Sequence, residues 1–416
     1  MRSTSVLILL ATLAGILSSV EALKEHSHHV KFKRQNPDKS KYPPVLKTPP
    51  RSSLPQDWVD ALENLQKAGK IPDIPVSTST DAGIFYPKNL KMSQKEICNW
   101  SITGCFGEND VHEAADGVWV VSFDDGPTAA SPGLYDFLHS HNQAGTHFMI
   151  GSQIVAYMDN AKHALQTQQQ LAVHTWSHSL QTTKDNYEVL GELGWTMQII
   201  YDISGRVPKY WRPPQGDVDN RVRAIAEGVF NLTTVMWDAE CNDWCIEDNG
   251  KSACPGETPG KSQKSVVDAI NKALQQPKSP GVMILEHELN KHTVGFFTDY
   301  YPRLAGLGWK PLSVPEQLGV NWYHNAVNND DTPINTTSML YATVSSAVTK
   351  ANSTNTNNNN SKVASNGNSN TTGNGNGNGS SKNLLSKSSS SSAQGSVVFF
   401  ALASVSIAMM LSMMFV

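Results

Sequence analysis

Residues 118–128 read Val-Trp-Val-Val-Ser-Phe-Asp-Asp-Gly-Pro-Thr, an apolar run followed by two adjacent carboxylates. The β-branched and aromatic residues of Val118–Phe123 are typical of a buried strand, which Gly126-Pro127 would end. Because side chains alternate along extended backbone, Asp124 and Asp125 can face different partners at the strand's end. Two carboxylates this close repel each other, so we expect a metal ion and an arginine beside them.

Strand-like runs alternate with helix-length segments across residues 79–320. The other expected strands are Thr146–Ile150, Leu171–His174, Thr233–Trp237, Val282–Glu286 and, more weakly, Trp309–Leu312. The expected helices are Pro132–Asn142, Ile154–Gln169, Asn186–Ser204, Asp219–Glu227, Ser265–Gln275 and Thr293–Leu307. This alternation predicts one parallel α/β domain with its site at the carboxyl ends of the strands.

Polar residues follow several of these strands. His174 and His178 are four residues apart, and two histidines with one carboxylate make the three-ligand set of a catalytic zinc or similar divalent ion. Arg212 precedes a stiff Pro-Pro turn, and His287 ends another apolar strand. Taken singly, each of these patterns more often reflects a structural role than a ligand or a catalytic group. Because all of them follow strands, we expect them to form a single site.

Five short motifs occur in the order found in polysaccharide deacetylases, the NodB-homology enzymes of carbohydrate esterase family 4. They are Ser122–Pro127, His174-x-x-x-His178, Arg212-Pro213-Pro214-x-Gly216, Glu240-x-x-Asp243-Trp244 and Ile284-Leu285-x-His287. Over about 115–315 the chain most resembles fungal chitin deacetylases. The resemblance implies an α/β fold of the distorted (β/α) barrel type and metal-dependent hydrolysis.

The same resemblance implies a role for each residue. Asp124 would be the general base, oriented by Arg212, and His287 the general acid, positioned by Asp243. The metal, Zn²⁺ or Co²⁺, would be held by Asp125, His174 and His178. The N–H of Gln215 would stabilise the oxyanion, and Trp244 and Leu285 would shape the acetyl pocket. Gln215, Glu240 and Glu288 depart from the usual residues of their motifs without removing a catalytic or ligand position.

The expected reaction is hydrolysis of the N-acetyl groups of N-acetylglucosamine units in chitin, giving chitosan and acetate for cell-wall modification. Two alternatives stay open: a catalytically silent wall-binding or structural mannoprotein, and a deacetylase of another acetylated polysaccharide. Nucleic acid is not an expected partner, because the formal net charge is −4 and no basic patch with interleaved aromatics occurs. We expect a monomer.

The two ends of the chain predict export and anchoring. Residues 1–22 resemble a signal peptide, and 23–78 a disordered leader or propeptide in which Lys33-Arg34 is either a processing site or two solvated charges. Residues 321–396, rich in Asn, Ser, Thr and Gly, predict a flexible stalk. The uncharged tail 397–416 predicts a GPI-anchor signal, with attachment within Ser386–Ala393 and the protein at the outer face of the plasma membrane and in the cell wall; a single-pass tail anchor is the alternative.

Cysteines and sequons fit a secreted protein. All five cysteines lie in the part of the chain expected to be secreted, which predicts disulfides. Their odd number leaves one thiol free or paired elsewhere, and Cys241 and Cys245 are able to close a small loop near the site. Zinc binding by these cysteines is the less favoured alternative. Glycosylation sequons occur at Asn99, Asn231, Asn335, Asn352, Asn359, Asn370 and Asn378.

Overall fold

The computed structural model describes residues 37–336 and 338–341. The predicted signal peptide, the Lys33-Arg34 pair, most of the predicted stalk with its last four sequons, and the tail 397–416 lie outside the described residues. Within the described part of the chain, none of the helices combines the length and the apolar character needed to span a membrane.

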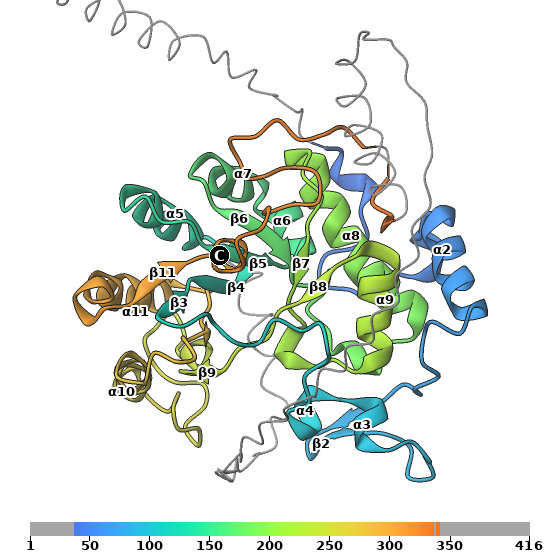
Figure 1. Cartoon of the computed structure of the whole chain (residues 1–416), viewed down its shortest axis with the longest axis horizontal. Helices are drawn as coiled ribbons and strands as arrows, with labels where there is room; N and C mark the ends of the chain where they lie inside the picture. Colours follow the sequence, from blue (N-terminus) through green and yellow to red (C-terminus); the bar gives the residue numbers. More distant parts are fainter. Residues whose placement is uncertain (1–36, 337, 342–416) are drawn as a thin grey trace, which may run out of the picture. The chain divides into compact units, whose positions relative to one another are not determined.

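A parallel sheet forms the centre of the domain (Figure 1). Its order is β4 (Ser122–Gly126), β5 (Thr146–Met149), β6 (Gln170–Val173), β7 (Tyr210–Trp211) and β8 (Thr233–Thr234). Every residue of β5 and β6 is buried, because helices cover the sheet on both faces.

Two further short strands partly close this sheet into a barrel. β9 (Ala239–Glu240) follows β8 along the chain and pairs in parallel with β10 (Ile284–Leu285). Beyond β10 the backbone returns to β4, where Asp124 N donates to Glu286 O (2.9 Å) and Glu288 N donates to Asp124 O (3.1 Å). The expected α/β fold of the distorted barrel type is therefore confirmed.

The strand predicted for Val118–Phe123 is divided in two. β3 (Val118–Val120) pairs with β11 (Lys310–Leu312), whereas β4 pairs with β5. The division falls at Val121, where the hydrogen-bond partner changes from Leu312 to the β5 strand. A change of partner strand depends on the tertiary arrangement, so the local pattern could not predict it.

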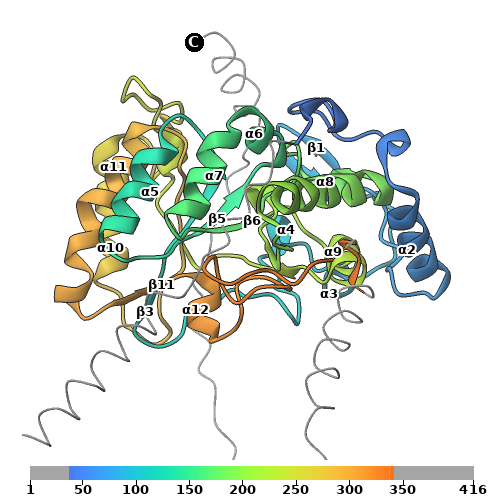
Figure 2. The same cartoon turned by 90° about the horizontal axis from the view of Figure 1, so that it is seen from above.

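Helices surround the sheet on two sides, as Figures 1 and 2 show. One group comprises α5 (Ser131–Ser140), α10 (Gln263–Leu274) and α11 (Lys291–Tyr300), and the other includes α8 (Asn186–Ser204) and α9 (Asn220–Phe230). α8 has the predicted bounds, because Asp185 caps its first turn and Gly205 ends it in a left-handed conformation. Between the two groups lie α6 (Gly151–Ala156) and α7 (Met158–Gln166), with α12 (Val314–Leu318) near the C-terminal end of the domain.

Two predicted helices are shorter than expected. The segment 154–169 is interrupted at Tyr157, which separates α6 from α7 with φ −113° and ψ 46°. The segment 293–307 leaves the α-helix at Tyr300 and continues as two 3₁₀ turns, Tyr301–Arg303 and Ala305–Leu307. Pro302 lies at this change and lacks the N–H that an α-helix would use.

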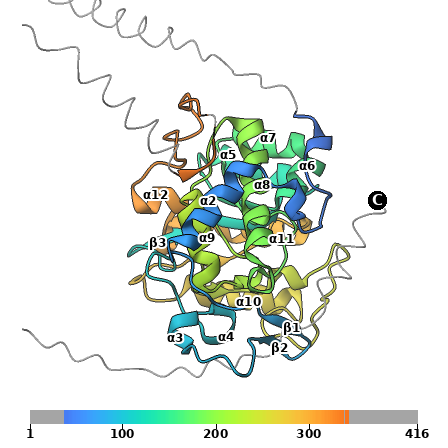
Figure 3. The same ribbon diagram turned by 90° about the vertical axis from the view of Figure 1, so that its right-hand side faces the viewer.

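The described fold includes a helix upstream of residue 79, the predicted start of the catalytic domain. α2 (Gln56–Lys67) buries Trp58, Val59 and Leu62 in the main core and packs against α8 and α9 (Figure 3). The prediction of a disordered leader rested on the polar residues before this helix and overlooked its amphipathic pattern. The short hairpin of β1 (Thr78–Thr80) and β2 (Gly83–Phe85) and the helices α3 (Gln94–Ile97) and α4 (Trp100–Thr103) follow it.

Buried residues also occur after residue 320, the predicted end of the catalytic domain. Trp322, Tyr323 and Ala326 are buried, and Asn325 bonds to backbone on both sides of Arg206. The folded part therefore includes residues that the composition assigned to the stalk. The prediction of a stalk therefore now concerns only the residues beyond 341.

The cysteines pair within two short loops. Cys98 is bonded to Cys105 and Cys245 to Cys254, while Cys241 is a buried free thiol. The prediction that Cys241 and Cys245 close a small loop is wrong, because Cys245 is bonded to Cys254. The expected disulfides are confirmed, and Cys241 is the thiol left free. Disulfides in a chain of this size are typical of an extracellular protein.

One predicted glycosylation site does not fit the fold. Asn99 is fully buried, caps α4 and donates from its amide to Tyr86 Oη at 3.1 Å. A glycan on this nitrogen has no room in the folded domain, because the sequon pattern does not report burial. Asn231 and Asn335 are at least partly accessible and stay predicted sites.

Candidate active site

A bulge at the end of β4 orients the two aspartates. Asp124 and Gly126 pair with the consecutive residues Phe148 and Met149, so Asp125 is an extra residue, with φ 70°. As a result, both carboxylates approach His174, whose Nε2 lies 3.3 Å from Asp125 Oδ1 and 3.7 Å from Asp124 Oδ2. Simple alternation along a strand would have sent them to opposite faces.

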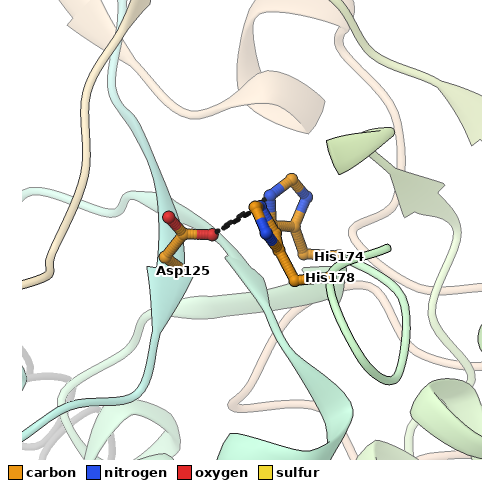
Figure 4. A group of neighbouring side chains, drawn as sticks. All are labelled: Asp125, His174 and His178. Atoms are coloured by element: carbon orange, nitrogen blue, oxygen red, sulfur yellow. Dashed lines mark ion pairs between the residues drawn. The ribbon is translucent and has the colours of Figure 1, made fainter. Parts of the chain in front are cut away.

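Asp125, His174 and His178 form a compact donor cluster (Figure 4). One ligand atom from each lies within 4.8 Å of the others, and His178 Nε2 is 3.1 Å from Asp125 Oδ1. His174 Nδ1 lies 2.7 Å from the Arg212 carbonyl oxygen, to which it donates. That bond leaves the lone pair of His174 Nε2 directed towards Asp125.

The donor set fits a divalent cation. Asp125 Oδ1 is buried and makes no regular hydrogen bond among the described residues, although two imidazole nitrogens face it. Burial alone would raise the pKa of Asp125, but the charge of His178 and the close approach of both imidazoles hold it well below its usual range. An ionised oxygen and two imidazole nitrogens are the ligands of an open catalytic zinc-type site.

Asp124 is held by a buried arginine. Arg212 Nη1 lies 2.7 Å from Asp124 Oδ1, and both side chains are almost wholly shielded from solvent. Arg212 also donates to Ser122 Oγ at 3.2 Å, and its guanidinium lies 4.2 Å from the centre of the Phe148 ring. This pairing satisfies one oxygen of Asp124 and leaves the other on the side of the metal cluster.

His287 is held by both oxygens of Asp243. Its Nδ1 lies 2.7 Å from Asp243 Oδ1, and its backbone N–H donates to Oδ2 at 2.9 Å. Burial would lower the pKa of His287, but the charge and hydrogen bond of Asp243 outweigh it and raise the pKa to about 10. The imidazolium therefore persists near neutral pH, with its Nε2 4.0 Å from Asp125 Oδ2.

The three residues predicted to contact the substrate lie on the same segments as Arg212, Asp243 and His287. Gln215 is exposed on the 3₁₀ turn Pro214–Gly216, in a left-handed conformation with φ 54°. Trp244 is partly buried beside Asp243, and Leu285 is buried in β10 directly before Glu286. Their contacts with a substrate stay predictions.

Two polar residues near the site were not predicted. Ser122 accepts a hydrogen bond from Arg212, and Glu192 of α8 accepts three from the loop between the two ligand histidines. Glu192 interrupts an apolar stretch, Val189–Leu193, in the middle of a helix. A carboxylate in such a stretch indicates a buried acceptor, so this signal was available in the sequence.

Comparison with known proteins agrees with this site. Residues 112–229 match the protein family described as Polysaccharide deacetylase. The chain is 39% identical over 349 residues to Chitin deacetylase 3 of Cryptococcus neoformans var. neoformans, covering 81% of this chain and 82% of that protein. It is 34% identical over 274 residues to Chitin deacetylase 1 of Cryptococcus neoformans var. grubii, covering 62% of this chain and 54% of that protein.

Among solved structures, the chitin deacetylase from the fungal pathogen Colletotrichum lindemuthianum aligns with a TM-score of 0.46 and 19% identity, covering 51% of this chain and 94% of that chain. The sequence relationship to the Cryptococcus proteins extends over most of both chains. The chain therefore belongs to the polysaccharide deacetylase family. Its relatives over most of its length are fungal chitin deacetylases.

Proposed function

We propose that this protein hydrolyses the N-acetyl groups of N-acetylglucosamine units in chitin, giving chitosan and acetate. The observation that carries the proposal is that the carboxylate of Asp124 and the imidazolium of His287, each held by a buried partner, both lie beside the Asp125–His174–His178 cluster. Amide hydrolysis needs one group to accept a proton from water and another to donate one to the departing nitrogen. The identity to chitin deacetylases supports the choice of polymer.

Each proton transfer has a residue suited to it. Asp124 accepts a proton from the attacking water with the oxygen that Arg212 does not occupy. His287 donates the Nε2 proton to the leaving amine, and Asp243 stabilises its charged form. The N–H of Gln215 is the proposed donor to the developing oxyanion.

A divalent cation held by Asp125, His174 and His178 would act as a Lewis acid on the amide carbonyl. We propose Zn²⁺ or Co²⁺, because two imidazoles and one carboxylate suit these borderline metals better than Mg²⁺ or Ca²⁺.

The test is acetate release by the purified full-length chain from chitin oligomers, with and without a chelator. We expect release that stops with chelation and returns when Zn²⁺ or Co²⁺ is added. Asp124→Asn should lower the rate by about 10²–10⁴-fold while the protein still binds metal. Asp125→Ala should lose the metal as well. Absence of acetate from chitin and from other acetylated glycans, with metal present, would favour a silent wall-binding protein instead.

We also propose that the protein is exported, acts as a monomer at the cell wall and is held at the outer face of the plasma membrane by a GPI anchor. The two disulfides support export. The anchor rests on the uncharged tail 397–416 and the serine-rich segment before it. Release of the protein from intact cells by a phospholipase specific for GPI anchors would test it, since a transmembrane tail would resist that enzyme.

A further inference from the structure

The loop between the two ligand histidines has an unfavourable backbone conformation. Thr175 has φ 64° and His178 has φ 58°, both in the left-handed region that residues with a Cβ rarely adopt. Such conformations are energetically costly and persist only where surrounding contacts hold them. The spacing of His174 and His178 therefore depends on what holds this loop.

Two helices hold the loop from opposite sides. At the start of α6, Gly151 N donates to Thr175 O at 2.9 Å, and Ser152 N donates to Trp176 O at 3.2 Å. These bonds fix the carbonyl groups of the loop. The amide groups need a separate acceptor, because they point the other way.

That acceptor is Glu192 of α8. Its Oε2 accepts from the backbone N–H groups of Trp176 and Ser177, each at 2.8 Å, and its Oε1 accepts from Ser177 Oγ at 2.5 Å. The Glu192 side chain is fully buried, and Trp176 and Ser177 are almost fully buried as well. Because these groups are shielded from bulk solvent, removing the carboxylate would deprive both amides of their acceptor.

We propose that Glu192 is a positioning residue of the metal centre, which holds His174 and His178 at the separation that a divalent cation requires. The inference rests on the metal site of the proposed function. Among the described residues, Glu192 makes no hydrogen bond to either histidine, and it acts through Trp176 and Ser177, two of the three residues between them. Because its role is to accept hydrogen bonds, a glutamine that keeps one oxygen towards the two amides should largely replace it.

The experiment measures metal binding directly. Zn²⁺ affinity of the metal-depleted full-length protein is obtained by competition with a chelating indicator, and the visible absorption of the Co²⁺ form reports ligand geometry. We expect Glu192→Ala to weaken Zn²⁺ binding by about 10–100-fold, as is typical for residues that orient metal ligands. Its Co²⁺ spectrum should change. Glu192→Gln should stay close to wild type in both measurements.

Two further variants separate positioning from general stability. Leu193→Ala removes a buried side chain from the same helix and should lower stability without changing Zn²⁺ affinity. Ser177→Ala removes the hydroxyl that donates to Glu192 and also bonds to Ser179, but it keeps the two backbone N–H donors. It should weaken binding less than Glu192→Ala, in the same direction. Wild-type affinity and spectrum in both Glu192→Ala and Ser177→Ala would overturn the inference about Glu192 alone. Failure of the wild-type protein to bind any divalent cation would overturn the metal centre itself.

Discussion

Arg212 and Asp124 form a buried ion pair, with Nη1 and Oδ1 2.7 Å apart and both side chains removed from solvent. Breaking such a pair on one side leaves an uncompensated buried charge. We therefore expect Arg212→Gln to lower the free energy of unfolding by roughly 3–5 kcal/mol, measured by urea denaturation.

The matched control is Arg51→Gln. Arg51 pairs with Glu63 at 3.4 Å, but its side chain is 60% exposed. Exposed pairs contribute about 0–1 kcal/mol, so this variant should be nearly as stable as wild type. Equal stability losses in the two variants would contradict the view that burial gives the Arg212–Asp124 pair its importance.

His324 should make the protein sensitive to acid. Burial, helped by Lys209, lowers the pKa of His324 to about 4, against 6.5 for a free histidine. Between these pH values the unfolded chain binds a proton that the folded chain does not. Stability from this group is therefore complete above pH 6.5 and falls as the pH is lowered towards 4, by up to roughly 3 kcal/mol.

The measurement is the urea midpoint at several pH values from 4 to 7. His324→Gln should flatten the curve in this range, whereas substitution of the exposed His139 should leave it unchanged. An identical pH dependence in wild type and His324→Gln would rule out His324 as the acid-sensitive group.

α2 should be an integral part of the domain. Leu62 is fully buried in the main core, so Leu62→Ala should cost about 2–5 kcal/mol in the free energy of unfolding. Leu318→Ala provides the comparison, because Leu318 is 42% exposed and should change stability by less than about 0.5 kcal/mol. If the Leu62→Ala protein were as stable as wild type, α2 would not be an integral part of the domain.

In protein that has not been reduced, Cys241 should be the only cysteine that a thiol reagent modifies. The reaction should require unfolding first. Its side chain is fully buried, and burial raises the pKa of its thiol well above the usual range, so the reactive thiolate is suppressed. Mass spectrometry after maleimide treatment, with and without denaturant, would check this. Labelling of Cys245 or Cys254 in unreduced protein would disprove the pairing of those two residues.

Much of the chemistry could be predicted from local sequence. Six residues lie at the ends of strands or shortly after them: Asp124, Asp125, His174, His178, Arg212 and His287. Parallel strands bring their carboxyl ends together, so the convergence of these residues required only the fold class. The bounds of α8 were equally predictable, because a capping aspartate and a terminal glycine mark them locally.

What only the tertiary structure decided involves contacts between distant segments. The bulge at Asp125, the division of the first strand at Val121 and the pairing of Cys245 with Cys254 all depend on partners that the local pattern does not name. The same is true of α2, whose apolar side is meaningful only against α8 and α9. The amino-acid sequence alone determined which groups are available for catalysis. Their distances, burial and charge states arise from the packing of segments far apart in the chain.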